Sequence, residues 1–253
     1  MPYIIPPAIT TRKPLSCERM KVNWEHPLNK NLVAGWLINE GSGGIVRSVV
    51  PNRNAEDTMG TGQAWVADIG GPGVSFSGDA TYVQMAANIG VSVPSTVVSS
   101  FRLTNMAASN QIVATDGRTN RYAGVGFNVS NAGKLGSTWG DDVGSGSTNR
   151  QTILGNGASV TVNKPCIAIC VWDAYNAARL YADGMSVPGT LSGTGTTPAP
   201  GTYAGTIGYR KLTPVICIGV IYWIMIYSRA LSIGECFQVM SNPFGTPDNP
   251  RLI

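Results

Sequence analysis

The longest uninterrupted apolar stretch of the chain runs from Val215 to Tyr227 and carries no charged residue. β-Branched and aromatic residues recur throughout it, and neither of its two alternating sets of side chains is polar, as in strands buried on both faces. The stretch is too short to cross a bilayer as a helix, which takes roughly 20 residues. The pattern therefore predicts a central strand with no face exposed to water.

The hydrophobic period changes directly after this strand. Ser232 lies three residues before Glu235, which is the spacing of a capping box at the start of a helix. Apolar residues then recur at helical spacing between Cys236 and Met240. We therefore expect a short amphipathic helix near the end of the chain.

Short apolar or alternating segments, separated by Gly, Asn, Asp and Pro, occupy most of the preceding sequence. The clearest expected strands are Leu32–Ile38, Ile45–Val50, Gly73–Gly78, Thr81–Met85, Ser95–Leu103 and Pro165–Asp173. Asp183 and Gly184 are expected to form a tight hairpin turn. Residues 57–73 and 188–206 are glycine-rich and are expected to be loops. So many short strands at turn-punctuated spacing predict an all-β sandwich.

The two ends of the chain differ from this pattern. Residues 1–30 contain five prolines, which prevent a long helix, and five basic against two acidic residues, which is most of the net charge of +4. We expect them to form an extended N-terminal arm. Residues 242–253 contain three prolines and are expected to be an extended tail. Residues 31–241 remain as the single folded domain.

Four segments carry a family resemblance: LVAGWLINEGSG (32–43), GPGVSFSGDATYVQM (71–85), IAICVWDAYNAARLYADGM (167–185) and GVIYWIMIYSRALSIGE (219–235). In this order they resemble laminin-G-like domains of the concanavalin A-like jelly-roll class. The resemblance runs from about Leu32 to Met240. It implies a jelly-roll β-sandwich that carries an N-terminal arm and a short C-terminal helix.

The flanking segments VNWEHPLNKNLVAGWLINEGSG (22–43) and NPFGTP (242–247) resemble laminin-G-like proteins encoded by tailed bacteriophages. This resemblance implies a non-enzymatic structural protein on the outer surface of the virion, assembled in the bacterial cytoplasm. The leading expectation is a capsid-surface decoration protein whose arm docks on the major capsid protein or other virion proteins. The alternative is a carbohydrate-binding module of a tail or fibre protein that acts in host adsorption.

Eight residues are expected to lie in protein interfaces: Tyr3, Ile4, Ile5, Arg12, Lys13, Trp24, Tyr222 and Trp223. The first six belong to the arm. The last two stand where the family often carries acidic, solvated residues, so they need cover from this chain's own segments or from a second subunit. We expect a homo-oligomer, with a trimer as the leading guess. Family acids are also missing at Ser48, which argues against a calcium site.

Catalytic, metal and cofactor sites are not expected. His26 is the single histidine, which excludes a histidine-based triad within one chain and the familiar multi-histidine zinc sites. No convincing strand carries the closely spaced carboxylates of a jelly-roll glycosidase. The five cysteines include no CxxC pair and are expected to be reduced. Neither a secretory signal nor a membrane span is expected, and the basic charge lies on the arm, which argues against nucleic-acid binding.

One loop offers a candidate ligand site. Trp139, Asp141 and Asp142 lie together in the glycine-rich segment STWGDDVGSG. An aromatic ring can stack on a sugar while carboxylates accept hydrogens from its hydroxyl groups, and the same carboxylates can contact a cation. The interpretation that we favour over this ligand site is a loop that a single tryptophan anchors to the domain.

Overall fold

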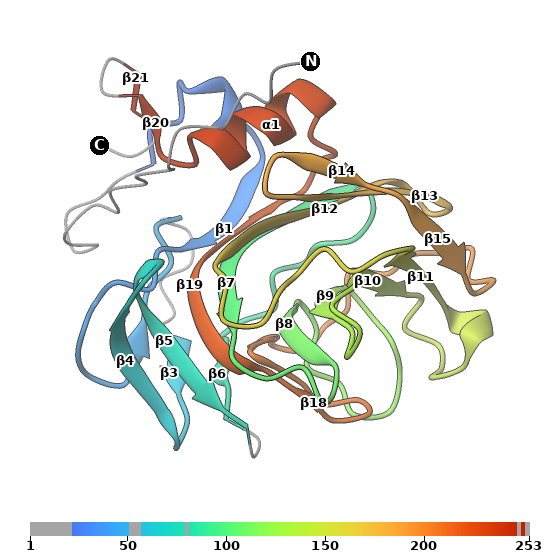
Figure 1. Ribbon diagram of the computed structural model, residues 1–253. Coiled ribbons are helices and arrows are strands. Elements are labelled where there is room, and N and C mark those ends of the chain that lie inside the picture. Colours follow the sequence, from blue (N-terminus) through green and yellow to red (C-terminus); the bar gives the residue numbers. More distant parts are fainter. Residues whose placement is uncertain (1–21, 51–56, 79–80, 247–248, 251–253) are drawn as a thin grey trace.

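The computed structural model describes residues 22–50, 57–78, 81–246 and 249–250 (Figure 1). These residues form two antiparallel β-sheets that pack face to face as a jelly-roll sandwich. A single short α-helix follows the last long strand, as the sequence predicts. The expected fold class is therefore confirmed.

Eight of the described strands form one sheet. In spatial order they are β14 (Met185–Val187), β13 (Ala177–Ala182), β12 (Cys166–Ala174), β7 (Ser95–Leu103), β19 (Ile218–Tyr227), β5 (Gly71–Ser77) and β4 (Gln63–Asp68), with β1 (Leu32–Trp36) also paired to β19. The strand β7 pairs with β19 along most of its length. On its other edge, β19 pairs first with β5 and then with β1, so it is the centre of the sheet.

Nine of the described strands form the second sheet. In spatial order they are β15 (Gly189–Ser192), β11 (Arg150–Gly155), β10 (Leu135–Gly140), β9 (Val125–Val129), β8 (Asn110–Ala114), β16 (Thr206–Ile207), β6 (Val83–Gln84), β3 (Asp57–Met59) and β2 (Ile45–Val46). Smaller elements are η1 (Pro27–Asn29), η2 (Ser147–Asn149), α1 (Ile233–Ser241) and the paired strands β17 (Tyr209–Arg210) with β18 (Val215–Ile216) and β20 (Gly245–Thr246) with β21 (Asn249–Pro250).

The main core fills the space between the two sheets. Its largest fully buried side chains include Trp36, Phe101, Phe127, Trp139 and Trp172. The rings of Trp139 and Trp172 meet edge to face, with centroids 6.4 Å apart. Burying aromatic side chains of this size is the largest favourable contribution that a sandwich core makes to folding.

A second core covers the outer face of the eight-stranded sheet, where α1 lies across the top of the sandwich in Figure 1. Cys236 and Met240 of α1 belong to this core, together with Val22, Leu28 and side chains of β12 and β19. Both faces of β19 are therefore buried, which confirms the prediction for Ile218–Tyr227. The first residues of the predicted strand instead form the separate short strand β18, so that part of the prediction is wrong. The capping box is also present, because Ser232 Oγ accepts from Glu235 N and Glu235 Oε2 accepts from Ser232 N.

The predicted strict alternation along β19 is wrong beyond Ile221, where a β-bulge shifts the pairing with β7. Tyr222 and Trp223 consequently both point into the second core, at 0% and 2% exposure. The Tyr222 hydroxyl donates to Asp68 Oδ2 over 2.5 Å, and the Trp223 ring packs edge to face on Phe244. Because this chain itself covers both side chains, the prediction that they form a subunit contact is wrong.

The flanks fold back more than the sequence suggested. Val22 and Leu28 are buried, and His26 Nδ1 accepts from Leu28 N to cap η1, so this part of the expected arm is compact. Trp24 is half exposed. In the expected extended tail, β20 and β21 form a small hairpin. The other predicted interface residues lie outside the described part of the chain: Tyr3, Ile4, Ile5, Arg12 and Lys13.

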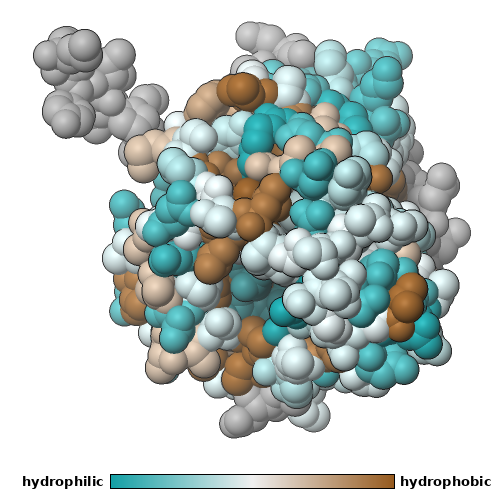
Figure 2. Space-filling view, turned by 90° about the vertical axis from the view of Figure 1, so that its right-hand side faces the viewer, coloured by the Kyte–Doolittle hydropathy of each residue, from teal (hydrophilic) through white to brown (hydrophobic). Residues whose placement is uncertain are grey.

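Two glycine-rich segments that were expected to be loops contain strands, of which β4 and β15 lie at sheet edges. Residues 57–73 include β3 and β4, and 188–206 include β15. An edge strand that faces solvent needs no alternation of apolar and polar residues. Strand β15 is such a strand, because it is exposed along its whole length. Figure 2 shows the side of the molecule on which β13 and β15 lie, where hydrophobic residues form a band across a largely polar surface. The hairpin turn at Asp183 and Gly184 is confirmed, with φ values of 45° and 81°.

Candidate functional site

The candidate site lies on the open face of the nine-stranded sheet, which points away from the core. Strand β9 shows how the sequence creates this face. Val125, Phe127 and Val129 point into the core, so Gly126 and Asn128 between them point outward. No second layer of helix or strand is expected over such small and polar side chains, because they offer little apolar surface to bury.

Strand register aligns these outward positions in two neighbouring rows. One row across β8, β9, β10, β11 and β15 contains Ala114, Gly126, Thr138, Thr152 and Ser192. The next row contains Gln111, Asn128, Gly136, Leu154 and Thr190. Small residues dominate the first row and keep the surface low, while amides and hydroxyl groups offer hydrogen bonds. The open face is therefore a shallow polar floor.

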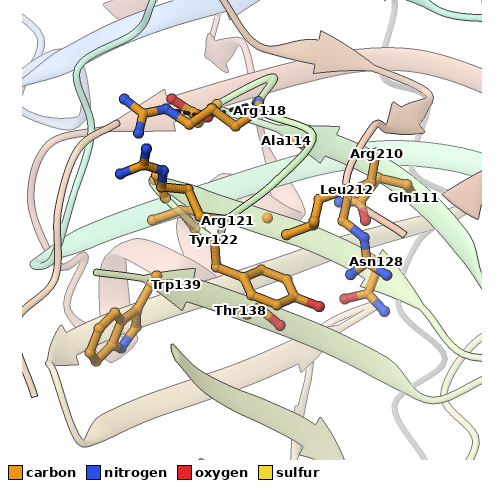
Figure 3. A pocket seen from close by; sticks show the side chains of 16 residues that line it. Gln111, Ala114, Arg118, Arg121, Tyr122, Asn128, Thr138, Trp139, Arg210 and Leu212 are labelled. Carbon is orange, nitrogen blue, oxygen red and sulfur yellow. Dashed lines mark hydrogen bonds and ion pairs between the residues drawn. The ribbon is translucent and has the colours of Figure 1, made fainter. Parts of the chain in front are cut away.

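A hollow of about 420 Å³, counted out to its open mouth, lies on this floor. This volume includes open solvent above the floor, so the hollow is a shallow depression and not an enclosed cavity. Figure 3 shows the Tyr122 ring between two groups of side chains, with Arg118 and Arg121 on one side and Asn128 and Arg210 on the other. Residues from the β8–β9 loop and from β17 thus form walls on a floor made by β8, β9 and β10.

Gly140 fixes the position of Tyr122. A Cβ atom at residue 140 would collide with the backbone carbonyl and Cβ of Tyr122, so the loop can approach β10 this closely only over a glycine. Tyr122 N donates to Gly144 O, and Asp142 N donates to Tyr122 O over 2.8 Å. The backbone that follows β10 therefore holds the aromatic residue that divides the hollow.

The carboxylates near the hollow are occupied by their own loops. Asp142 forms an ion pair with Arg118 and lies 3.7 Å from Arg121 Nε. Asp116 Oδ2 accepts from the backbone N–H groups of Thr202 and Tyr203. The predicted ligand residues Asp141 and Asp142 thus stabilise loop structure.

Asp141 completes this arrangement at the other side of the loop. Its Oδ1 accepts from Val143 N over 2.8 Å, and its Oδ2 accepts from Asn149 Nδ2 over 2.9 Å. Both oxygens thus hold the loop to which Asp141 belongs. The arrangement offers no pair of free carboxylates for glycoside hydrolysis within the described hollow.

Trp139 does not take the role that the sequence suggested. Its side chain is fully buried in the main core, and its Nε1 donates to Tyr175 O over 2.9 Å. In Figure 3 the indole points away from Tyr122. The prediction that Trp139 stacks on a ligand is therefore wrong, since alternation along β10 places Thr138 on the open face and Trp139 on the core face.

Sequence reasoning missed the side chains that the structure brings together: Tyr122, Asn128, Arg150 and Arg210. Arg150 Cζ lies 4.3 Å and Arg210 Cζ 5.9 Å from the centroid of the Tyr122 ring. Alternating Gly and Asn in YAGVGFNV could have identified the open face of β9. No comparable signal links Arg150 or Arg210 to it, because those residues come from distant segments.

The described residues contain neither a metal-binding cluster nor a helix that could span a membrane. Among them, no cluster of three or more His, Cys, Asp or Glu side chains is placed to hold a metal ion. Within the same residues, no helix has both the length and the apolar character to cross a bilayer. The four cysteines of the described chain are buried free thiols: Cys166, Cys170, Cys217 and Cys236.

No protein-family model matches the chain, and no curated protein is similar to it in sequence. In structure it is similar to the CBM40 of the Ruminococcus gnavus IT-sialidase bound to α2,3-sialyllactose. The TM-score is 0.54 at 19% identity, covering 66% of this chain and 96% of that one.

Two toxin binding domains are also similar in structure. The binding domain of Paraclostridial Mosquitocidal Protein 1 has a TM-score of 0.62 at 16% identity and covers 84% of this chain. The binding domain of botulinum neurotoxin serotype D/C has a TM-score of 0.58 at 14% identity, also over 84% of this chain. This chain spans 52% of each toxin chain. At such identities the likeness establishes the fold, a jelly-roll sandwich that these binding domains share.

Proposed function

We propose that this chain is a non-catalytic carbohydrate-binding module whose site is the hollow on the open face of the nine-stranded sheet. The observation that carries the proposal is a low polar floor with the largely buried Tyr122 side chain, 8% exposed, beside it. Sugars present both hydroxyl groups and apolar C–H faces, so they are bound by side chains that offer hydrogen bonds beside an aromatic surface.

The polar floor supplies suitable hydrogen-bonding groups. The carboxamide of Asn128 makes no hydrogen bond to any described residue, so both its donor and its acceptor are free for a ligand. The hydroxyl groups of Thr138 and Thr152 lie 3.0 Å apart on adjacent strands. Each hydroxyl retains capacity beyond this mutual bond. A shallow, open floor of this kind suits a sugar that belongs to a longer chain.

Absence of free paired carboxylates supports binding rather than hydrolysis. Within the described hollow, Asp116 and Asp142 are held by backbone N–H groups and arginines. The similar structures named above are a carbohydrate-binding module and two toxin binding domains. They favour a binding role for this chain.

The virion setting rests on the resemblance of residues 22–43 and 242–247 to laminin-G-like proteins of tailed phages. A glycan-binding module of a tail or fibre protein accommodates both that resemblance and the hollow. We therefore place this function ahead of the capsid-surface decoration protein. Immunogold labelling of purified virions distinguishes them, because a decoration protein is found on the head.

A glycan array on the purified protein, followed by calorimetry with the best ligand, tests the proposal. Replacing Asn128 by Ala removes one free hydrogen-bonding group and is expected to weaken binding about tenfold. The control is Asn176→Ala, which changes an exposed asparagine in the β12–β13 turn. Absence of binding to any glycan at millimolar concentration, or equal affinities for the two variants, overturns the proposal.

A further inference from the structure

Arg118, Arg121 and Arg210 line the hollow, and Arg150 lies beside it against the Tyr122 ring. These arginines fall into two groups by charge balance. Arg118 and Arg121 share the carboxylate of Asp142, and Arg118 Nε also lies 3.9 Å from Asp116. Neither Arg150 nor Arg210 forms an ion pair with any carboxylate in the described part of the chain. Two positive charges on this face thus have no countercharge.

Only some of the N–H donors of the Arg210 guanidinium group have hydrogen-bond partners. Its Nη2 donates to Thr213 Oγ1 over 2.9 Å, while its buried Nε has no hydrogen-bond partner. In Figure 3 its guanidinium group points toward Asn128. A buried donor without a partner is costly, so such a group is expected to find one in a ligand or in water.

Arg150 approaches the same aromatic ring from β11, where register places it opposite Gly140. Its guanidinium carbon lies 4.3 Å from the Tyr122 ring centroid. A cation–π contact uses the face of the guanidinium group and leaves its in-plane N–H groups free to donate. No hydrogen bond from this side chain to a described residue uses those N–H groups.

The positive charges of Arg150 and Arg210 interact electrostatically. Burial lowers the pKa of Arg210, the charge of Arg150 lowers it further, and Tyr122 opposes both effects. Like charges repel, and an anion bound by both groups would reduce that repulsion. The fold thus holds two cations together around Tyr122 without supplying the negative charge that would balance them.

We propose that Arg150 and Arg210 bind the anionic substituent of an acidic glycan, a carboxylate or a sulfate ester, beside Tyr122. This inference rests on the proposed function and specifies its ligand. The planar guanidinium fork matches two oxygens of either group, and hydrogen bonds between charged partners are the strong ones. Asn128 then contacts a neutral part of the same sugar.

Calorimetry with one acidic oligosaccharide and its neutral methyl ester or desulfated form tests this proposal. The acidic form is expected to bind at least tenfold more tightly at low salt, with the preference shrinking as salt screens the charges. Arg150→Gln and Arg210→Gln should each remove most of the preference. Arg210→Lys should retain part of it, because the charge remains without the fork. The control Lys164→Gln removes one exposed charge elsewhere and should leave the preference unchanged.

Equal affinity for the acidic and neutral forms overturns the inference and leaves the glycan-binding function standing. If no glycan binds, a sulfate titration monitored by NMR of the arginine Nε–H groups separates the two proposals. Chemical shift changes at Arg150 and Arg210, lost in the double Gln variant, would establish an anion site without a glycan. Unchanged shifts together with no glycan binding would overturn both. Melting temperatures of all variants verify that each is folded.

Discussion

Tyr222 and Trp223 are neighbours in the chain, yet their side chains lie on the same face of β19. The β-bulge after Ile221 places both in the core between the eight-stranded sheet and its cover, at 0% and 2% exposure. A bulge inserts one extra residue and reverses the alternation that follows. The chain therefore needs no second subunit to cover this strand, and the predicted homo-oligomer has to be sought at another surface.

Replacing Trp223 by Asp should destabilise the monomer strongly. The change leaves a cavity opposite Phe244 and puts an unpaired charge into a buried apolar core, at a cost of about 3–5 kcal/mol. Urea unfolding monitored by circular dichroism measures it. Trp223→Phe keeps an aromatic ring there and should cost far less. A Trp223→Asp protein with wild-type stability would contradict the described burial.

Gly140→Ala should disturb the hollow from beneath. The added methyl group collides with the backbone of Tyr122, and such overpacking costs about 1–3 kcal/mol. Because the loop must move, glycan affinity should fall together with the melting temperature. Gly157→Ala is the matched control, since an added Cβ at that position contacts nothing. Equal melting temperatures for the two variants would show that the loop accommodates the methyl group freely.

Acid should weaken the attachment of α1. Hydrogen bonds from Arg229 lower the pKa of Glu235 to about 2, with burial opposing and Ser232 reinforcing the effect. A carboxylate with a lowered pKa stabilises the fold above its unfolded pKa, near 4.5, and this stability is lost as pH falls toward 2. The partly exposed pair should contribute on the order of 1 kcal/mol.

Comparing wild type with Glu235→Gln by urea unfolding between pH 7 and pH 2 measures this contribution. The free energies of unfolding should differ at pH 7 and converge at the acidic end. A difference that stays constant across the range would assign the effect to the capping hydrogen bonds alone, because those do not depend on the charge in the same way.

Alkylation should be slow in the native protein and complete after denaturation, because the described thiols are buried. Burial raises the pKa of Cys170, Cys217 and Cys236 to about 12, so thiolate is scarce at pH 8. The four described cysteines should resist iodoacetamide in the native protein. After denaturation without reductant, intact mass should show all five cysteines modified. A shortfall of two would reveal a disulfide.

Much of the fold was predictable because a long run of apolar residues can be recognised in a sequence as a buried strand. The run ending at Tyr227 and the capping box at Ser232 are local patterns with few alternative structures. The bulge at Tyr222 and the exposed edge strand β15 were not predictable. A bulge leaves no mark in an all-apolar run, and an edge strand in solvent needs no apolar face.

Prediction of the site failed for a different reason. Trp139 was chosen because an aromatic residue beside two acids has the composition of a sugar site. Along a short strand, however, composition does not reveal which alternate set of residues faces the core. Tyr122, Arg150 and Arg210 meet through register and loop placement, so only the folded chain brings their side chains together.

Both described ends of the chain, near Val22 and Phe244, pack on the side of the sandwich opposite the hollow. The described part of the chain therefore begins at the back of the domain, and its last packed side chain lies there too. A surface, tag or carrier joined there would present the hollow outward without blocking it. For binding assays, immobilisation through a terminal tag should leave the hollow accessible to a ligand. Random coupling through lysines would block the hollow in part of the molecules. Lys211, which lies near the stacked rings of Tyr82 and Tyr209, is on the hollow side.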